Sequence, residues 1–129
     1  MALILIVDDS PTEVHVMKKA LEQHGYRTAV AGDGEEGIRL ARQMHPDLIF
    51  MDIVMPGVNG YQATRTLTND PDTRKIPIVM VTSKGQETDR IWGLRQGAVD
   101  YMVKPVSMDQ LVEKAQAARA PRKIWRARR

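Results

Sequence analysis

The sequence has no cysteine, no long apolar run and no recognisable export signal. Without cysteine, disulfide bonds and thiol chemistry are excluded, although this absence does not decide the compartment. No stretch approaches the ~18 consecutive apolar residues that a membrane-spanning helix requires. The opening residues, MALILIVDD, lack the basic start and the small-residue cleavage site of a signal peptide. We therefore expect a cytoplasmic protein without a membrane span.

Positive charge is concentrated at the C-terminal end of the 129-residue chain. Residues 119–129 contain six positive charges and no acidic residue, namely Arg119, Arg122, Lys123, Arg126, Arg128 and Arg129. Residues 1–118 contain 13 basic and 16 acidic residues, so the high isoelectric point belongs to the tail. We expect one domain over residues 1–118 and a basic tail over 119–129 that is disordered or extends the last helix.

Short apolar runs alternate with helical patterns along the predicted domain. Runs typical of strands lie at residues 3–7, 26–31, 47–51, 76–81 and 101–103. Helical patterns lie at residues 10–25, 34–45, 60–67, 86–97 and 107–118. Five strand–helix units with short links predict an α/β domain with a parallel sheet and helices on both faces. A closed barrel needs about 200 residues or more, so we predict an open, doubly wound, five-stranded parallel sheet with five helices.

The helix boundaries and buried faces follow from local patterns. Ser10 is predicted as the N-cap of the first helix, Pro11 suits the first helical position, and Glu13 completes a capping box. Gly25 is the predicted C-cap, and Pro46 ends the second helix. The side chains predicted to face the core of the first, second and fourth helices are Val14, Met17, Leu21, Ile38, Ala41, Met44, Ile91 and Leu94.

Polar residues stand at the ends of four predicted strands. Asp8 and Asp9 end the first, Asp52 the third, Thr82 the fourth and Lys104 the fifth. If the strand order is 2-1-3-4-5, the first and third strands flank the point where ligands bind in open α/β sheets. The five side chains would then share one crevice.

This set of side chains has a chemical interpretation. Clustered carboxylates without histidine or cysteine favour a hard cation such as Mg²⁺. A carboxylate can also act as a nucleophile toward a phosphoryl group and form an aspartyl phosphate. The ammonium of Lys104 would offset charge on the transferred oxygens, and the Thr82 hydroxyl could donate a hydrogen bond to one of them.

The motifs VDDS (7–10), MDIVMPGVNG (51–60), VTS (81–83) and YMVKPV (101–106) resemble those of the receiver domain of bacterial two-component response regulators. The resemblance covers about residues 2–118 and implies a CheY-like, flavodoxin-like fold. It also implies that Asp52 is the phospho-acceptor. Mg²⁺ would be bound by Asp9 directly, by Asp8 largely through water, by Asp52, and by the main-chain carbonyl of Val54.

The same resemblance assigns the remaining roles. Thr82 and Lys104 would contact the phosphoryl group, Tyr101 would be the rotating switch aromatic, and the bond from Lys104 to Pro105 would be a cis peptide. Within the family, the motifs DDSPTE, MDIVMPGVNGYQATR and KGQETDRIWGLRQGA are similar to those of stand-alone, chemotaxis-like receivers of twitching-motility (type IV pilus) pathways. Val54 and Lys84 depart from better-known receivers at positions that, by resemblance, influence phosphoryl lifetime.

The resemblance implies a signalling protein rather than an enzyme, with Mg²⁺-dependent self-phosphorylation and self-dephosphorylation only. Its phosphodonor would be a sensor histidine kinase or the phosphotransfer domain of such a kinase. We expect a monomer whose output protein binds to the surface formed by the fourth helix, fifth strand and fifth helix. The alternative output is a phosphate sink that drains a kinase.

Competing interpretations account for less of the pattern. Asp8 and Asp9 could merely cap a helix, but capping does not explain the matching ends of the other strands. A phosphatase with an aspartyl-phosphate intermediate would need a substrate pocket, usually in a cap insertion, for which the links are too short. The basic tail could give salt-sensitive nucleic-acid affinity but no sequence specificity. His15, His24 and His45 lack metal-ligand spacing, and Trp92 is predicted to be partly exposed.

Overall fold

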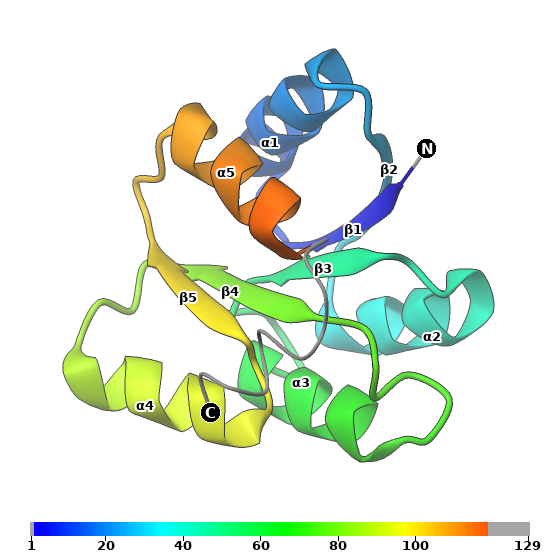
Figure 1. Cartoon of the computed structure of the whole chain (residues 1–129). Helices are drawn as coiled ribbons and strands as arrows, with labels where there is room; N and C mark the ends of the chain where they lie inside the picture. The colour runs from blue at the N-terminus through cyan, green and yellow to red at the C-terminus, as the bar shows by residue number, and fades with distance from the viewer. Residues whose placement is uncertain (1, 119–129) are drawn as a thin grey trace.

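The computed structural model describes residues 2–118 and shows one parallel sheet between two layers of helices (Figure 1). In chain order the elements are β1 (Leu3–Val7), α1 (Pro11–Gln23), β2 (Arg27–Ala31), α2 (Gly34–Met44), β3 (Leu48–Met51), α3 (Gly60–Asn69), β4 (Ile78–Thr82), α4 (Glu87–Gln96), β5 (Asp100–Val103) and α5 (Met108–Ala118). The predicted basic tail, residues 119–129, lies outside the described residues. No helix in the described part of the chain is long and apolar enough to cross a membrane.

The sheet has the order β2-β1-β3-β4-β5, and every neighbouring pair of strands is parallel. The predicted order 2-1-3-4-5 and the doubly wound architecture are confirmed. Because β3 lies beside β1 rather than beside β2, the strand order reverses between β1 and β3. That reversal brings the ends of β1 and β3 together at the carboxyl edge of the sheet.

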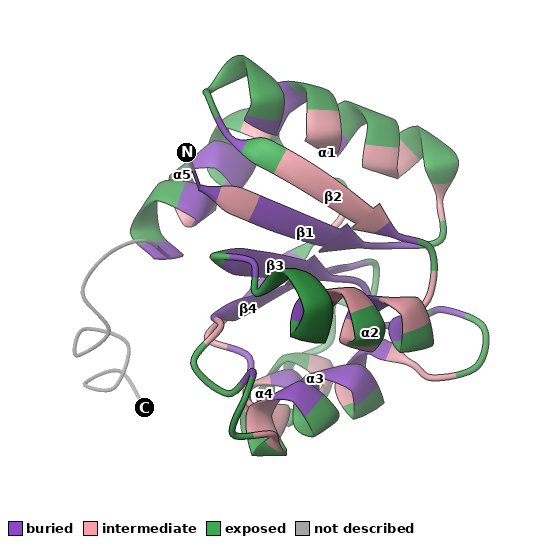
Figure 2. Ribbon diagram, turned by 90° about the vertical axis from the view of Figure 1, so that its right-hand side faces the viewer, coloured by how far each residue is buried: buried purple, intermediate pink, exposed green. Residues whose placement is uncertain are grey.

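Two apolar clusters fill the faces of the sheet. One packs α1 and α5 against the sheet through residues such as Met17, Leu21 and Leu111. The other packs α2, α3 and α4 against the opposite face, and Leu67 belongs to it. Figure 2 shows the buried strands β1, β3 and β4 between helices whose outer surfaces are exposed. Apart from Thr82 at the end of β4, the central strands β1, β3 and β4 are apolar, as is typical of parallel strands covered on both faces.

Three local expectations change in the structure. The C-cap of α1 is His24, and Gly25 follows it with a φ of +88°, a conformation that glycine adopts without strain. Met44 was expected to face the core but is 41% exposed, since it is the final residue of α2 and lies beyond the buried stripe that ends at Ala41. Ile91 was also expected to be buried and is 41% exposed.

The orientation of α4 explains the error at Ile91. Gly93 is the buried residue of this helix, and a Cβ built on it would meet the ring of Tyr101 at 3.2 Å. Two residues of helix correspond to about 200°, so Ile91 lies on the side opposite to Gly93. Trp92 is 48% exposed, in line with its predicted partial exposure.

Candidate functional site

The backbone at the carboxyl edge of the sheet positions the predicted site residues. The N–H of Asp8 donates to the carbonyl of Ala31 at 3.1 Å, and the N–H of Asp52 donates to the carbonyl of Val7 at 2.9 Å. The N–H of Lys104 donates to the carbonyl of Thr82 at 2.8 Å. Strand pairing thus continues one residue beyond β1, β3 and β5, and this fixes the directions in which three of the site side chains leave the sheet.

Three carboxylates from two loops meet at this edge. One oxygen from each of Asp8, Asp9 and Asp52 lies within 4.8 Å of the others. Asp8 and Asp52 are buried, whereas Asp9 is exposed. An all-oxygen donor set of this kind, open to solvent on one side, fits a hard cation that retains part of its water shell.

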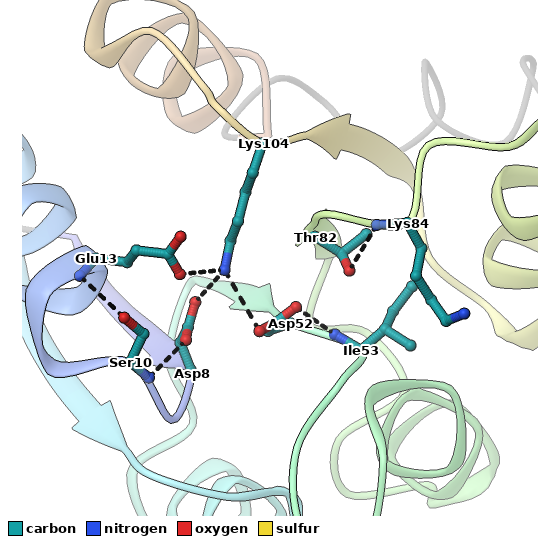
Figure 3. Close-up of polar contacts among 8 residues, drawn as sticks. All are labelled: Asp8, Ser10, Glu13, Asp52, Ile53, Thr82, Lys84 and Lys104. Atoms are coloured by element: carbon teal, nitrogen blue, oxygen red, sulfur yellow. Dashed lines mark hydrogen bonds and ion pairs between the residues drawn. The ribbon is translucent and has the colours of Figure 1, made fainter.

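The ammonium of Lys104 is surrounded by acidic side chains (Figure 3). Its Nζ lies 2.9 Å from Asp8 Oδ2, 3.4 Å from Asp52 Oδ2 and 2.5 Å from Glu13 Oε2. Burial by itself lowers the pKa of Lys104, but the hydrogen bonds to Glu13 and Asp8 outweigh burial, so that the pKa lies above its ordinary value. Lys104 therefore carries a full positive charge at neutral pH.

The surroundings of Asp52 disfavour its charged form. The N–H of Ile53 donates to its Oδ1 at 2.7 Å. Burial raises the pKa of Asp52, the charge of Lys104 opposes that rise, and the nearby Asp8 adds to it, with the net result that the pKa is raised. A cation bound to this carboxylate would offset the unfavourable burial of its negative charge.

Thr82 and Tyr101 are connected through the backbone of Lys84. Thr82 is fully buried, and its Oγ1 accepts a hydrogen bond of 3.4 Å from the N–H of Lys84. The Tyr101 hydroxyl donates to the carbonyl of Lys84 at 2.6 Å, and its ring is buried. Burial is the main cause that raises the pKa of Tyr101, so the hydroxyl is a neutral donor. A shift of the backbone at Lys84 would therefore change the hydrogen bonds of both side chains.

The other predicted positions lie around this centre. The peptide bond between Lys104 and Pro105 is cis. Val54 lies in the loop between β3 and α3, two residues after Asp52, and the residue is 56% exposed. The ammonium of Lys84 lies 4.0 Å from Asp89 on α4. Within residues 2–118, the three histidines do not belong to a cluster that could hold a metal ion.

Glu13 is the site residue that the sequence analysis missed. Its N–H donates to Ser10 Oγ at 3.4 Å, so Ser10 is the N-cap as predicted. The other half of the predicted capping box is wrong, because the N–H of Ser10 donates to Asp8 Oδ1 at 2.9 Å and the carboxylate of Glu13 contacts Lys104 instead. The only signal available in the sequence was the position of Glu13, one turn after the Asp8–Asp9 pair.

Comparisons with known proteins agree with this geometry. The family model of the response regulator receiver domain matches residues 4–116. Protein PilH of Pseudomonas aeruginosa is 54% identical over 120 residues, which are 93% of this chain and 99% of PilH.

Two solved structures are also similar. The chemotaxis response regulator CheY4 of Vibrio cholerae matches with a TM-score of 0.86 at 28% identity, over 92% of this chain and 98% of CheY4. The receiver domain of the sensor histidine kinase PA1611 of Pseudomonas aeruginosa, which has a magnesium ion coordinated in its active site cleft, matches with a TM-score of 0.84 at 33% identity. That match covers 90% of this chain and 95% of the PA1611 domain. The predicted family is confirmed: this chain belongs to the response regulator receiver domains.

Proposed function

We propose that Asp52 accepts a phosphoryl group from a sensor histidine kinase or its phosphotransfer domain, and that this modification switches the binding of a partner. The observation that carries the proposal is the buried carboxylate of Asp52, which lies beside the acidic pair Asp8 and Asp9 and 3.4 Å from the ammonium of Lys104. Membership of the receiver family supports it.

The chemistry follows from the positions of these groups. A carboxylate oxygen of Asp52 attacks phosphorus, the bond from phosphorus to the donor breaks, and its electron pair leaves with the donor. Lys104 offsets the negative charge on the transferred oxygens, and Thr82 donates a hydrogen bond to one of them. Mg²⁺ would be held by Asp8, Asp9, Asp52 and the main-chain carbonyl of Val54, and it would supply further positive charge there.

The pathway we propose is twitching-motility signalling, with the chain acting as a stand-alone receiver. The motifs DDSPTE and MDIVMPGVNGYQATR, similar to those of receivers from such pathways, support this assignment. The 54% identity to PilH, which extends over 93% of this chain and 99% of that protein, also supports it.

For the output we favour protein binding over a phosphate sink. Large apolar side chains are exposed on α4 and β5, where Ile91 is 41%, Trp92 48% and Val103 46% exposed. The ring of Tyr101 lies beneath α4, beside Gly93, so that its movement would alter this surface. A protein that only drained phosphoryl groups from a kinase would need neither the apolar surface nor the aromatic switch.

The proposal is tested by incubating the chain with acetyl phosphate and Mg²⁺ and following its intact mass. We expect the gain of one phosphoryl group in the native protein, no gain in Asp52→Asn, and a normal gain in the control Asp109→Asn, which changes an exposed carboxylate on α5. Equal modification of Asp52→Asn would overturn the assignment. Turnover on phosphomonoesters would favour a hydrolase instead.

A further inference from the structure

The Glu13 carboxylate has a partner that a helix cap does not require. Its Oε2 lies 2.5 Å from Lys104 Nζ, the shortest of the three contacts of that ammonium with carboxylates. Glu13 and Lys104 are separated by 91 positions in the sequence, and they come from α1 and from the loop after β5. Figure 3 shows Lys104 reaching down between Glu13 on one side and Asp52 on the other.

We propose that Glu13 is a positioning residue that anchors Lys104 in the resting protein and releases it when Asp52 becomes phosphorylated. The inference rests on the proposed function, since it concerns the group that would neutralise the phosphoryl oxygens. It adds a determinant on α1 to the site at the ends of the strands.

The three N–H donors of Lys104 limit how many phosphoryl oxygens it can bind while it keeps its present contacts. An ammonium has three N–H donors, and Asp8, Glu13 and Asp52 together can accept all three. The contact with Asp52 is the longest, at 3.4 Å. A phosphoryl group on Asp52 would bring additional negative charge and new acceptor oxygens to that side of the ammonium. The one N–H that points at Asp52 can bind one of these oxygens, so Lys104 can bind a second oxygen only by giving up one of its two shorter contacts.

Burial decides which contact is given up. The side chain of Asp8 is 3% exposed, so water could not readily replace the hydrogen bond that its carboxylate would lose if the ammonium moved away. The side chain of Glu13 is 44% exposed, and its carboxylate can return to water at small cost. Glu13 is therefore the partner that Lys104 leaves. Because the contact exists only in the resting state, it stabilises that state and opposes phosphorylation.

The test is the affinity for beryllofluoride, a non-covalent mimic of the aspartyl phosphate, measured by calorimetry at saturating Mg²⁺. Glu13→Gln removes the charge and keeps the shape, and we expect it to bind beryllofluoride about fivefold more tightly than the native protein, as the loss of a partly exposed ion pair implies. Glu35→Gln is the matched control, because Glu35 is an acidic residue in the first turn of α2, on the other face of the sheet. This control should retain the native affinity.

Glu13→Asp separates a direct contact from a general effect of charge. The shorter side chain keeps the charge but retracts the carboxylate by about 1.5 Å, which breaks the contact with Lys104. We expect it to resemble Glu13→Gln. Native affinity in Glu13→Asp together with tighter binding in Glu13→Gln would show that only the charge matters, and this would overturn the positioning role.

A double variant tests whether Glu13 acts through Lys104. In a Lys104→Ala background that circular dichroism shows to be folded, Glu13→Gln should no longer change the affinity. If Lys104→Ala does not fold, the Glu13→Asp comparison decides the matter. Unchanged or weaker binding in Glu13→Gln would overturn the inference and leave the proposed function intact. Failure of the native protein to bind beryllofluoride would instead count against the proposed function itself.

Discussion

At the scale of single residues, the chemistry of Asp52 is set by its surroundings. The carboxylate is buried beside Asp8, and burial is the main cause that raises its pKa. A buried anion of this kind lowers the stability of the fold at neutral pH unless a cation is bound. The fold therefore accommodates Asp52, the proposed phospho-acceptor, at some loss of stability, and perturbed carboxylates of this kind are common at functional sites.

The unfavourable burial of the Asp52 carboxylate predicts how the stability of the protein depends on pH. In the absence of Mg²⁺, Asp52→Asn should raise the melting temperature at pH 7 by about 2–5 °C, since the amide carries no charge to bury. Because the folded pKa of Asp52 is raised, ionisation disfavours the fold only above the unfolded pKa of about 3.9. The gain should therefore disappear as the pH falls toward 4.

Thermal unfolding of both proteins at pH 4 and pH 7, with EDTA present, checks this expectation. A gain of the same size at both pH values would show that ionisation of Asp52 is not the cause. A melting temperature lower than that of the native protein at pH 7 would show that the ion pair with Lys104 outweighs burial.

At the scale of elements, the start of α3 is packed tightly against the end of β3. The N–H of Gly60 donates to the carbonyl of Ile53 at 3.0 Å, and a Cβ on Gly60 would lie 2.0 Å from the carbonyl oxygen of Asp52. Backbone atoms cannot swing aside as the end of a long side chain can. Because Gly60 has no side chain, the start of α3 can approach the backbone of Asp52 this closely. The contact holds the loop that carries Val54 in place.

Gly60→Ala should consequently lower the free energy of unfolding by about 2–3 kcal/mol, the cost expected of overpacking. It should also weaken Mg²⁺ binding, because the backbone of Asp52 must shift. Gly32→Ala is the control, since a Cβ at Gly32 meets nothing within 4 Å. Urea denaturation and a Mg²⁺ titration measure both effects, and equal stability of the two variants would contradict this account of the α3 start.

At the scale of the whole molecule, the site and the exposed apolar surface lie on connected elements. The site lies at the carboxyl edge of the sheet, and Ile91, Trp92 and Val103 are exposed on α4 and β5. Thr82 and Tyr101 join the two through the backbone of Lys84. Phosphorylation can shift the population of surface states only through differential contacts of this type.

Partner binding provides the test at this scale. Protein activated with beryllofluoride should retain a partner protein that the untreated protein does not retain. Trp92→Ala and Tyr101→Ala should lose this partner while still gaining a phosphoryl group on Asp52. Val16→Ala serves as the control, because Val16 is 44% exposed on α1.

Pull-downs of the four proteins, with mass spectrometry of the bound fraction, make the comparison. If activation changes no partner while Asp52 rapidly empties a kinase of phosphoryl groups, the phosphate-sink output is correct. If Tyr101→Ala retains the partner, partner binding does not depend on Tyr101, the proposed switch aromatic.

The sequence by itself determined the fold class and placed Asp8, Asp9, Asp52 and Lys104 at one edge of the sheet, whereas the strand order entered as a condition that the family resemblance supported. Strand and helix periodicity are local patterns, and parallel strands place all of their carboxyl ends on the same edge. Family motifs then indicated what those residues do. Each of these inferences needs only neighbouring residues or a general rule of topology.

Only the tertiary structure determines which group each side chain contacts. The Glu13 carboxylate was predicted to accept a hydrogen bond from the N-cap residue of its own helix. It instead contacts the charged ammonium of Lys104, which lies 91 positions away in the sequence. Ile91 fitted a buried stripe, yet α4 turns Gly93 toward Tyr101 and leaves Ile91 in solvent. Such choices depend on distances through space and on competition for charge, and a local pattern contains neither.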